Sequence, residues 1–281
     1  MTGELEIVPV TTEEERRAFA RFPWELYRGD PYWVPPIFSD RLALLNPAKH
    51  PFYEHAKVQL FTARRGGKMV GTVSAHVNHR HNEVYGDKVG FFGFFEVIDD
   101  EDVARALLDA AAGWLREQGM DAMRGPESFS QNEEVGLLID GYDAPPVIMM
   151  TYNPRYYQGF IERADFEKVQ DLYAWDILTS IFDLDVQRMP RKFLRVAEEA
   201  RKKEGLVVQR IDMKNFDREV ARAKEVYNAA WEKNWGFVPM TDHEIEHLGE
   251  ELKMVLDPDL IYLAELCGET VGVSLGVPDV N

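Results

Sequence analysis

Residues 98–102, Ile-Asp-Asp-Glu-Asp, lie at a junction where many coenzyme-binding proteins hold a phosphate group. The surrounding sequence, KVGFFGFFEVIDDEDVARALLDAAAGWL at residues 88–115, predicts a buried strand followed by an amphipathic helix. A glycine-rich loop at such a junction lets backbone amides at the helix N-terminus contact an anion. Here acidic side chains replace the glycines and satisfy the helix dipole by capping it. The junction therefore predicts weak phosphate binding, or none.

Glu96 is a second candidate for chemistry, because it is the one carboxylate on the strand GFFGFFEV. A lone carboxylate on an otherwise aromatic strand is a candidate for proton transfer. The alternative interpretation is a glutamate that reaches the solvent edge of its strand and has no chemical role. Both interpretations stay open at this stage.

Three histidines, His76, His79 and His81, fall within six residues, and Glu83 and Asp87 follow them. These residue types bind metals, but their spacing belongs to a strand end and a loop, and no second cluster complements them. We therefore expect no metal site.

Asn132 and Glu133 lie in the polar stretch RGPESFSQNEEVG, residues 124–136, which follows a predicted strand. Loops after strands often carry substrate-binding residues in α/β folds, so these two are candidates for orienting an amine. The alternative is an ordinary helix cap, in which Ser130 stands three residues before Glu133.

Alternating strands and helices must position these residues. The pattern predicts strands at 5–10, 58–65, 69–78, 90–97, 121–128 and 166–177, and the turn Gly66-Gly67-Lys68 predicts a hairpin. A helix should start after a capping box of Thr11 with Glu14 and run through ERRAFARFPWELYRGD, and another should extend from Asp102 to Gly119. A third is expected within residues 144–164. This order predicts a mixed α/β layer fold, an α+β arrangement around a mixed sheet.

The second half repeats the first. The stretch LFTARRGGKMVGTVSAHVN at 60–78 aligns without a gap to IYLAELCGETVGVSLGVPD at 261–279, an offset of 201 residues. Leu5 and Leu206 share this offset. We therefore predict a duplication: a first domain at 1–178, a helical linker at 179–205 and the N-terminal part of a second domain at 206–281. We expect the natural protein to continue past Asn281; a natural gene ending there would contradict this.

Composition excludes several classes of function. The 281 residues include 32 basic and 49 acidic side chains, and the net charge of −17 argues against nucleic acid as a partner. No apolar run is long enough to span a membrane, and the acidic N-terminus does not resemble a signal peptide. The single cysteine, Cys267, fits a reducing compartment. We expect a cytoplasmic protein without membrane partners; the oligomeric state is not predicted.

The element order, the hairpin segment VGTVSAH and the late segment NPRYYQGFIERADFEKV together resemble the GNAT acyltransferase superfamily. The chain is similar to bacterial GNAT-like proteins with two such domains, which are N-acetyltransferases or related acyltransferases. The resemblance implies tandem GNAT folds, with acetyl-CoA or another acyl-CoA as co-substrate and a small-molecule amine or peptide as acceptor. No metal is implied.

The resemblance also implies roles for individual residues. Glu96 stands where the family often has a carboxylate that deprotonates the amine, while Tyr156 and Tyr157 are candidates for the general acid because Ile161 occupies the position of the usual tyrosine. Phe94, Phe95 and Val97 would contact the pantetheine arm, and Asp102 and Val103 would face the pyrophosphate.

The loop at 98–102 departs from the family's Q/R-x-x-G-x-G/A pattern, so we expect a degenerate first coenzyme site. The alternative function is a non-catalytic module that binds a small molecule or a partner. An aminoacyl-tRNA-dependent transferase with twin GNAT domains is disfavoured by the net charge. The repeated phenylalanines of GFFGFF indicate a strand covered on both faces, or else the wall of a cleft for an acyl chain.

Overall fold

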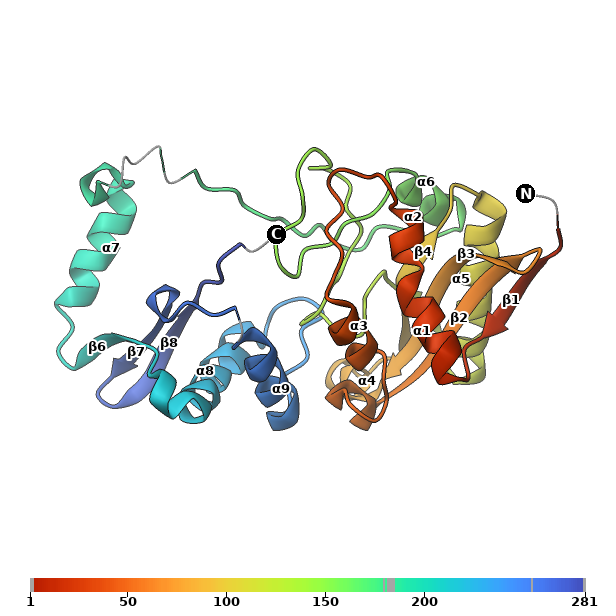
Figure 1. Ribbon diagram of the computed structural model, residues 1–281. Helices are drawn as coiled ribbons and strands as arrows, with labels where there is room; N and C mark the ends of the chain where they lie inside the picture. The colour runs from red at the N-terminus through yellow and green to blue at the C-terminus, as the bar shows by residue number, and fades with distance from the viewer. Residues whose placement is uncertain (1–2, 179, 181–184, 254, 280–281) are drawn as a thin grey trace. The chain divides into compact units, whose positions relative to one another are not determined.

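The computed structural model describes residues 3–178, 180, 185–253 and 255–279 (Figure 1). The chain divides into two compact units. Unit 1 comprises Met1–Lys168, Asn234–Val238 and Asp279–Asn281, and unit 2 comprises Val169–Lys233 and Pro239–Pro278. The boundaries expected from the sequence, at residues 178 and 206, stay a prediction.

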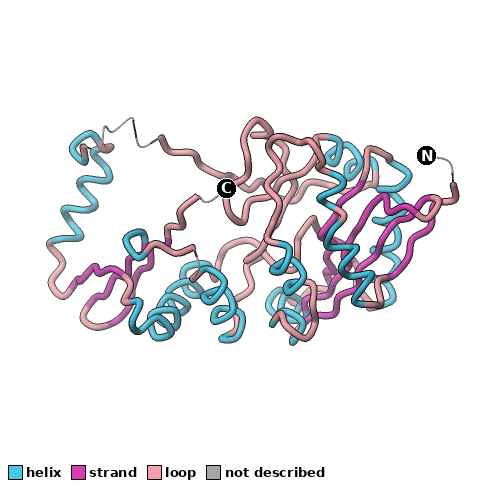
Figure 2. The backbone as a smooth tube through the Cα atoms, in the orientation of Figure 1, coloured by secondary structure: helices cyan, strands magenta, loops and turns pink. Residues whose placement is uncertain are grey.

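Unit 1 alternates helices and strands up to β5, after which a long stretch without helix or strand leads to α6 (Figure 2). Its elements are β1 (Leu5–Pro9), α1 (Glu13–Arg21), α2 (Pro23–Leu26), α3 (Phe38–Leu44), η1 (Pro51–Glu54), β2 (Ala56–Arg65), β3 (Lys68–Asn78), α4 (His79–Tyr85), β4 (Val89–Val97), α5 (Glu101–Glu117), β5 (Ala122–Arg124) and α6 (Tyr156–Arg163).

The sheet of unit 1 has the order β1-β2-β3-β4-β5. Neighbouring strands are antiparallel except β4 and β5, which are parallel, so the predicted mixed sheet is confirmed. The predicted hairpin is also confirmed. Gly66 and Gly67 both have positive φ, +58° and +79°, the conformation that a tight two-residue hairpin turn requires and that glycine adopts without strain.

A bulge interrupts β4 directly before Glu96. Thr72 of β3 pairs with Glu96, but Ser74 pairs with Gly93, so Phe94 and Phe95 together oppose a single residue of β3. Phe94 has φ of +44°, and its carbonyl accepts a hydrogen bond of 3.0 Å from the hydroxyl of Thr72. Bulges of this kind redirect side chains and are frequent beside functional sites.

The strands β4 and β5 pair over only three residues each, from Val89 with Ala122 to Phe91 with Arg124. Beyond this point residues 127 and 128 bind β4. The amide of Glu127 donates to the carbonyl of Phe92 at 2.8 Å. This approach requires glycine at position 93, because a Cβ there would lie 2.0 Å from the carbonyl oxygen of Glu127.

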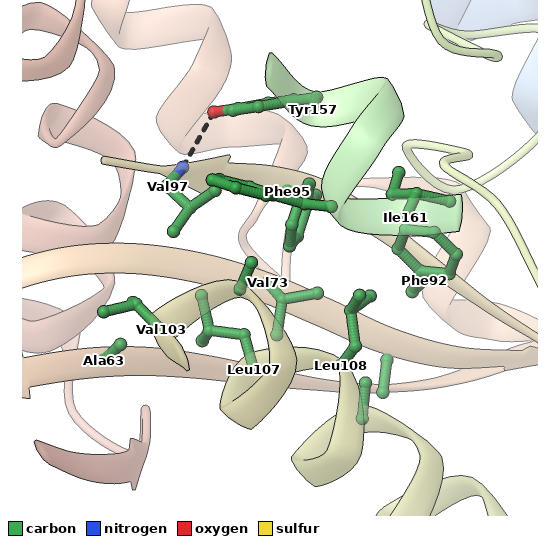
Figure 3. Packing of buried hydrophobic residues seen from close by; sticks show 14 of the residues in the cluster. Ala63, Val73, Phe92, Phe95, Val97, Val103, Leu107, Leu108, Tyr157 and Ile161 are labelled. Atoms are coloured by element: carbon green, nitrogen blue, oxygen red, sulfur yellow. Dashed lines mark hydrogen bonds between the residues drawn. The ribbon is translucent and has the colours of Figure 1, made fainter. Parts of the chain in front are cut away.

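The helix α5 packs on the sheet through the apolar positions that the sequence predicted (Figure 3). The residues of α5 in this core are Val103, Ala104, Leu107, Leu108, Ala111 and Leu115. Gly71 of β3 lets the helix approach, since a Cβ at that position would lie 2.7 Å from Leu107 Cδ1. The phenylalanines of β4 are buried, which supports the reading of that strand as core.

Three local predictions need correction. The capping box joins Thr12 to Glu15, one residue later than expected. The first helix is not continuous, because α2 begins at Pro23, a residue that is favourable in a first helical turn but disruptive in a helix interior. Residues 166–177 form no strand, since the described part of the chain provides no strand to pair with them.

Unit 2 contains a three-stranded sheet of order β6-β7-β8 with two longer helices between β6 and β7. Its elements are η3 (Val186–Arg188), α7 (Arg191–Arg201), β6 (Leu206–Arg210), η4 (Met213–Asn215), α8 (Phe216–Trp231), α9 (Asp242–Leu252), η5 (Pro258–Leu260), β7 (Ile261–Leu266) and β8 (Glu269–Leu275).

The strand registers support the duplication. Leu5 pairs with Arg65 in unit 1, and Leu206 pairs with Leu266 in unit 2, so both partners are displaced by 201 residues. Ala63 likewise pairs with Gly71, and Ala264 pairs with Gly272. Each hairpin is irregular directly after that alanine. A chance likeness of two hairpins would not reproduce both the register and the irregularity.

Within the described ranges, no helix is both long enough and apolar enough to cross a membrane.

Candidate active site

Glu96 lies between two tyrosine hydroxyls. Tyr27, just after α2, donates to Glu96 Oε2 at 2.8 Å, and Tyr157 of α6 donates to the same oxygen at 2.9 Å. Both tyrosines are buried, and Glu96 is partly buried. The sequence predicted Glu96 and Tyr157 as candidates, and the structure brings them into direct contact.

Burial raises the pKa of Glu96 to about 7. The hydrogen bonds from Tyr27 and Tyr157 act in the opposite direction, because they stabilise the ionised carboxylate. Glu134 raises the pKa further by charge repulsion, and Arg41 lowers it. A carboxyl group with this pKa can both accept and release a proton near neutral pH.

Arg41 and Glu134 form an ion pair, with Nη2 and Oε1 2.7 Å apart. The guanidinium of Arg41 also lies over the ring of Phe94, with its carbon 5.3 Å from the ring centroid, which is within reach of a cation–π interaction. This pair connects α3 to the loop after β5 beside the bulged strand. It therefore fixes two of the charges that act on Glu96.

The two adjacent tyrosines of α6 both bind the backbone of Val97. Tyr157 accepts a hydrogen bond of 2.7 Å from the Val97 amide (Figure 3), and Tyr156 donates one of 2.8 Å to the Val97 carbonyl. Burial raises the pKa of Tyr157 well above its usual value, and the charge of Glu96 adds to this effect. Tyr157 is therefore neutral and donates to Glu96, whereas Tyr156 donates to the backbone of β4.

Several aromatic side chains surround Tyr27, next to the carboxylate of Glu96. The ring of Trp33 stacks on Tyr27 with centroids 5.0 Å apart, and Tyr152 lies 5.8 Å from Tyr27. Trp24 contacts Trp33 edge to face at 5.5 Å. Asp30 holds this loop by accepting hydrogen bonds from the hydroxyl of Tyr152 and from backbone amides of the loop. Apolar ring surface thus lies next to a titratable group.

The residues predicted to contact a coenzyme are already engaged. The Phe94 amide donates to Ser128 Oγ at 3.3 Å, the Val97 amide is bound by Tyr157, and Phe95 packs against the Tyr157 ring. Val103 is buried in the core, while Asp102 is exposed in the first turn of α5.

The N-terminus of α5 is closed by acidic capping, as the sequence indicated. Asp100 is the N-cap residue and accepts a hydrogen bond of 3.3 Å from the Val103 amide. Arg65 forms an ion pair with Asp100, and its hydrogen bond is the main cause that lowers the pKa of that carboxyl. The side chains present at this helix end do not fit the pyrophosphate of a coenzyme, because the Asp100 carboxylate already holds the Val103 amide and is itself paired with Arg65.

Asn132 and Glu133 lie in a turn rather than at a helix cap. The Asn132 amide donates to Ser130 Oγ at 3.2 Å, and the Glu133 amide donates to the Ser130 carbonyl at 3.1 Å. Glu133 Oε1 lies 3.8 Å from Nε2 of His50. The helix-cap alternative is therefore wrong, while the substrate-binding role of both residues stays a prediction.

The histidines are dispersed. His76 is enclosed by rings of Phe52, Phe91 and Phe129, and burial lowers its pKa to about 3. His81 stacks on Tyr85. Among the described residues, no group of three or more metal-binding side chains is present.

Sequence reasoning missed Tyr27, Arg41 and Glu134. Tyr27 stands 69 positions before Glu96, and nothing in its local sequence links it to β4. Glu134 directly follows a predicted residue, so a wider reading of the polar loop would have included it. Nothing in the sequence around Arg41 indicated that it would lie near Glu96.

Comparisons with known proteins add to this geometry. No protein-family model matches the chain. The chain is 37% identical over 282 residues to the bacterial ceramide synthase of Caulobacter vibrioides (strain NA1000 / CB15N), covering 99% of this chain and 71% of that protein. It is 36% identical over 269 residues to the protein YghO of Escherichia coli (strain K12), covering 96% of this chain and 67% of that protein.

Among solved structures, a tandem GNAT protein from the clavulanic acid biosynthesis pathway matches with a TM-score of 0.52 and 15% identity. The match covers 96% of this chain and 73% of that chain, so it extends over both units and shows the fold. The chain therefore belongs to the family of the bacterial ceramide synthase and YghO, and its fold is that of a tandem GNAT protein.

Proposed function

We propose that the protein is an N-acyltransferase that joins the acyl group of an acyl-CoA to the amine of a long-chain amino alcohol. The main support for this proposal is Glu96 on the bulged strand β4. Its carboxyl group has a pKa of about 7 and lies between two tyrosine hydroxyls. The substrate class follows from the relative named bacterial ceramide synthase, because a ceramide is the amide of a fatty acid and a long-chain amino alcohol. We place this reaction in the cytoplasm.

The chemistry requires the removal of two protons from the ammonium nitrogen. An alkylamine is protonated at neutral pH, with a pKa near 10, and has no lone pair for attack until the first proton leaves. Ionised Glu96 accepts this proton and later releases it to solvent. The nitrogen lone pair then forms the C–N bond to the thioester carbonyl carbon, the C–S bond breaks, and the sulfur leaves with its electron pair. The second proton leaves the nitrogen and ends on the thiolate, which gives the neutral amide and the free thiol of coenzyme A.

Of the two tyrosines predicted as general acids, only Tyr157 contacts Glu96. Its hydroxyl donates a hydrogen bond to the carboxylate that accepts the proton, whereas Tyr156 donates to the Val97 carbonyl. We propose that Tyr157 and Tyr27 position Glu96 and moderate its pKa, and that Glu96 carries the proton itself. Asn132 and Glu133 remain proposed contacts of the amine.

The coenzyme part of the acyl-CoA donor does not fit unit 1 in the usual GNAT manner. The N-terminus of α5 is capped, and the backbone amides of Phe94 and Val97 in β4 already have hydrogen-bond partners. We therefore propose that unit 1 supplies proton transfer and that its α5 terminus does not hold the pyrophosphate.

The same observation favours a second candidate, a non-catalytic module on a GNAT scaffold. Every polar group named at the β4 edge already has a protein partner, as expected for a site that has lost its ligand. In that case Glu96 would keep its raised pKa but would have no effect on turnover.

The experiment is an acylation assay in which the protein is incubated with palmitoyl-CoA and a long-chain 2-amino alcohol, with mass spectrometry of the amide. We expect amide formation that depends on enzyme, and Glu96→Gln should lower kcat by about 100-fold or more. Tyr53→Phe is the matched control, because the Tyr53 hydroxyl donates to the Leu45 carbonyl and not to Glu96.

Two results would overturn the proposal. Amide formation at equal rates by the parent protein and Glu96→Gln would remove Glu96 from the chemistry. No amide with any acyl-CoA, together with no heat on calorimetric titration with acetyl-CoA, would support the non-catalytic module.

A further inference from the structure

The helix α7 exposes an apolar face. Phe193, Val196, Ala197 and Ala200 follow the i, i+3, i+4, i+7 spacing, so they lie along one side of the helix. No residue of α7 is buried, and Phe193 and Val196 are 62% and 58% exposed. An amphipathic helix normally buries such a face, and this one contacts solvent.

The segment around α7 is basic in an acidic chain. Residues 188–203 contain seven lysines and arginines and two glutamates, a net charge of +5, whereas the whole chain carries −17. Arg191, Lys192 and Arg195 lie on the side of α7 away from Phe193, and all three are exposed. The apolar face is therefore combined with a polar face rich in positive charge.

The stretch before α7 in the same unit exposes further apolar and aromatic side chains. Tyr173 is 75% exposed and Trp175 is 84% exposed, and Ile177 follows them. Tryptophan and tyrosine are enriched where a bilayer meets water, because their rings are apolar and carry a polar group. Residues 169–178 and α7 both belong to unit 2, so this unit contains an exposed aromatic segment as well as a basic amphipathic helix. Figure 1 labels the position of α7.

We propose that α7, with residues 169–178 before it, is a docking surface for an anionic phospholipid membrane. A helix with a large apolar face and a lysine- and arginine-rich polar face lies in the interface plane, with its apolar side chains among the acyl chains and its cations among the headgroups. The acidic remainder of the chain is repelled by the same surface, so only this face approaches it.

Other occupants fit less well. A nucleic acid offers phosphates but no apolar layer to cover Phe193 and Val196, and it is repelled by the chain's net charge. A second copy of α7 would cover the apolar face but would bring two sets of positive charges together. The proposal revises the expectation from the sequence that membranes are not partners, because that expectation considered only spanning segments and total charge.

The proposal goes beyond the proposed function and does not depend on it. An enzyme acting on long-chain amino alcohols would meet its substrate at a membrane, so a membrane-binding surface would bring the enzyme to that substrate. A non-catalytic protein could bind a membrane equally well. Vesicle binding and amide formation are measured separately, so either result can fail alone.

The test is flotation of the full chain with vesicles of phosphatidylcholine, with and without about 30% phosphatidylglycerol. We expect binding only to the anionic vesicles, and loss of binding when salt rises from about 0.1 M to about 1 M, which shortens the screening length from about 10 Å to about 3 Å. Trp175 should report insertion, since quenching by brominated lipid should decrease in Trp175→Phe.

The decisive variant is Arg191→Glu/Lys192→Glu/Arg195→Glu, which should weaken binding to anionic vesicles by at least about tenfold. Glutamates at positions 191 and 192 lie in the first turn of α7, where acidic residues favour the helix. Circular dichroism of the variant should therefore match that of the parent protein. The charge-matched control is Arg28→Glu/Lys49→Glu/Lys68→Glu, whose three residues are exposed in unit 1. A second variant, Phe193→Asp, tests the apolar face at a position already exposed to solvent.

Equal loss in the control, or unchanged binding in both α7 variants, would overturn the assignment to α7. Absence of binding to anionic vesicles would overturn the proposal that the protein binds a membrane. A change of oligomeric state in Phe193→Asp, measured by light scattering without any effect on vesicle binding, would instead assign the face to a second copy of the chain.

Discussion

The hydroxyl of Tyr27 and the carboxylate of Glu96 are 2.8 Å apart, although 69 positions separate them in the chain. The bulge in β4 lies directly before Glu96, and Tyr27 is the C-cap residue of α2. The carboxylate proposed for proton transfer is thus bound by a residue that is distant from it in sequence. The pKa of Glu96 depends on this contact.

Tyr27→Phe should move the pH dependence of the reaction upward. The hydrogen bond from Tyr27 lowers the pKa of Glu96, so its removal should raise that pKa above about 7. A base must be ionised to accept a proton, and the rising limb of kcat/KM against pH should therefore shift to higher pH. The control is again Tyr53→Phe, which should leave the limb in place; an unchanged limb in Tyr27→Phe would contradict the assignment.

Glu96→Gln should stabilise the fold at high pH while it removes activity. The pKa of Glu96 is raised in the folded protein from 4.5 to about 7, so the stability linked to its protonated form is complete below pH 4.5 and is lost as pH rises to about 7. Glutamine can still accept both tyrosine hydrogen bonds. We expect the variant to gain on the order of 3 kcal/mol in free energy of unfolding at pH 8 relative to pH 4, measured with urea.

Glu127 offers a matched comparison. It is buried, and burial raises its pKa to about 8, against a smaller opposing effect of Arg124. Glu127→Gln should show the same sign of stabilisation at high pH, because its proton is also retained on folding. Its turnover should match that of the parent protein. Loss of activity in both variants would mean that stability, and not proton transfer, explains the effect of Glu96→Gln.

His76→Phe should make the protein more resistant to acid. The pKa of His76 is lowered to about 3 by burial, so the folded state holds it neutral while the unfolded state takes up a proton below pH 6.5. Stability linked to this group is complete above pH 6.5 and is lost as pH falls toward 3. Phenylalanine suits the surrounding rings and cannot ionise. The midpoint of acid unfolding should move to lower pH, and a shift to higher pH would contradict the account.

Gly93→Ala should destabilise unit 1 by about 2 kcal/mol or more, because its Cβ would overlap the backbone of Glu127. The control is Gly113→Ala in α5, where nothing lies within 4 Å of the added carbon. Alanine is favoured over glycine in a helix, so the control should gain up to about 1 kcal/mol. Thermal unfolding of both variants measures the difference. Equal behaviour would show that residues 127 and 128 move away without cost.

Much of unit 1 followed from its sequence because the signals there are local. Alternating apolar residues, two turn glycines and a helical repeat from Val103 to Leu115 defined the hairpin, β4 and α5. The repeat at an offset of 201 identified the second sheet, since duplicated strands keep their pairing.

The rest depended on partners far away in sequence. Tyr27 bonds to Glu96 only because the sheet brings α2 and β4 together, and no pattern near either residue contains that information. Residues 166–177 have strand-like composition, but a strand needs a neighbour for its backbone groups, and composition cannot supply one. Glu96 itself was predictable as a lone charge on an apolar strand, whereas its pKa required the folded surroundings.

Gly71 and Gly272, at corresponding positions of the two hairpins, differ in the space around them. A side chain at Gly71 would meet Leu107 of α5 at 2.7 Å, whereas one at Gly272 would meet only Ala264 Cβ, at 3.3 Å. The helix that crosses Gly71 therefore excludes a side chain there, while the described neighbours of Gly272 impose a milder restriction. Mutational tolerance should differ between these two positions although they have the same place in the register of their hairpins.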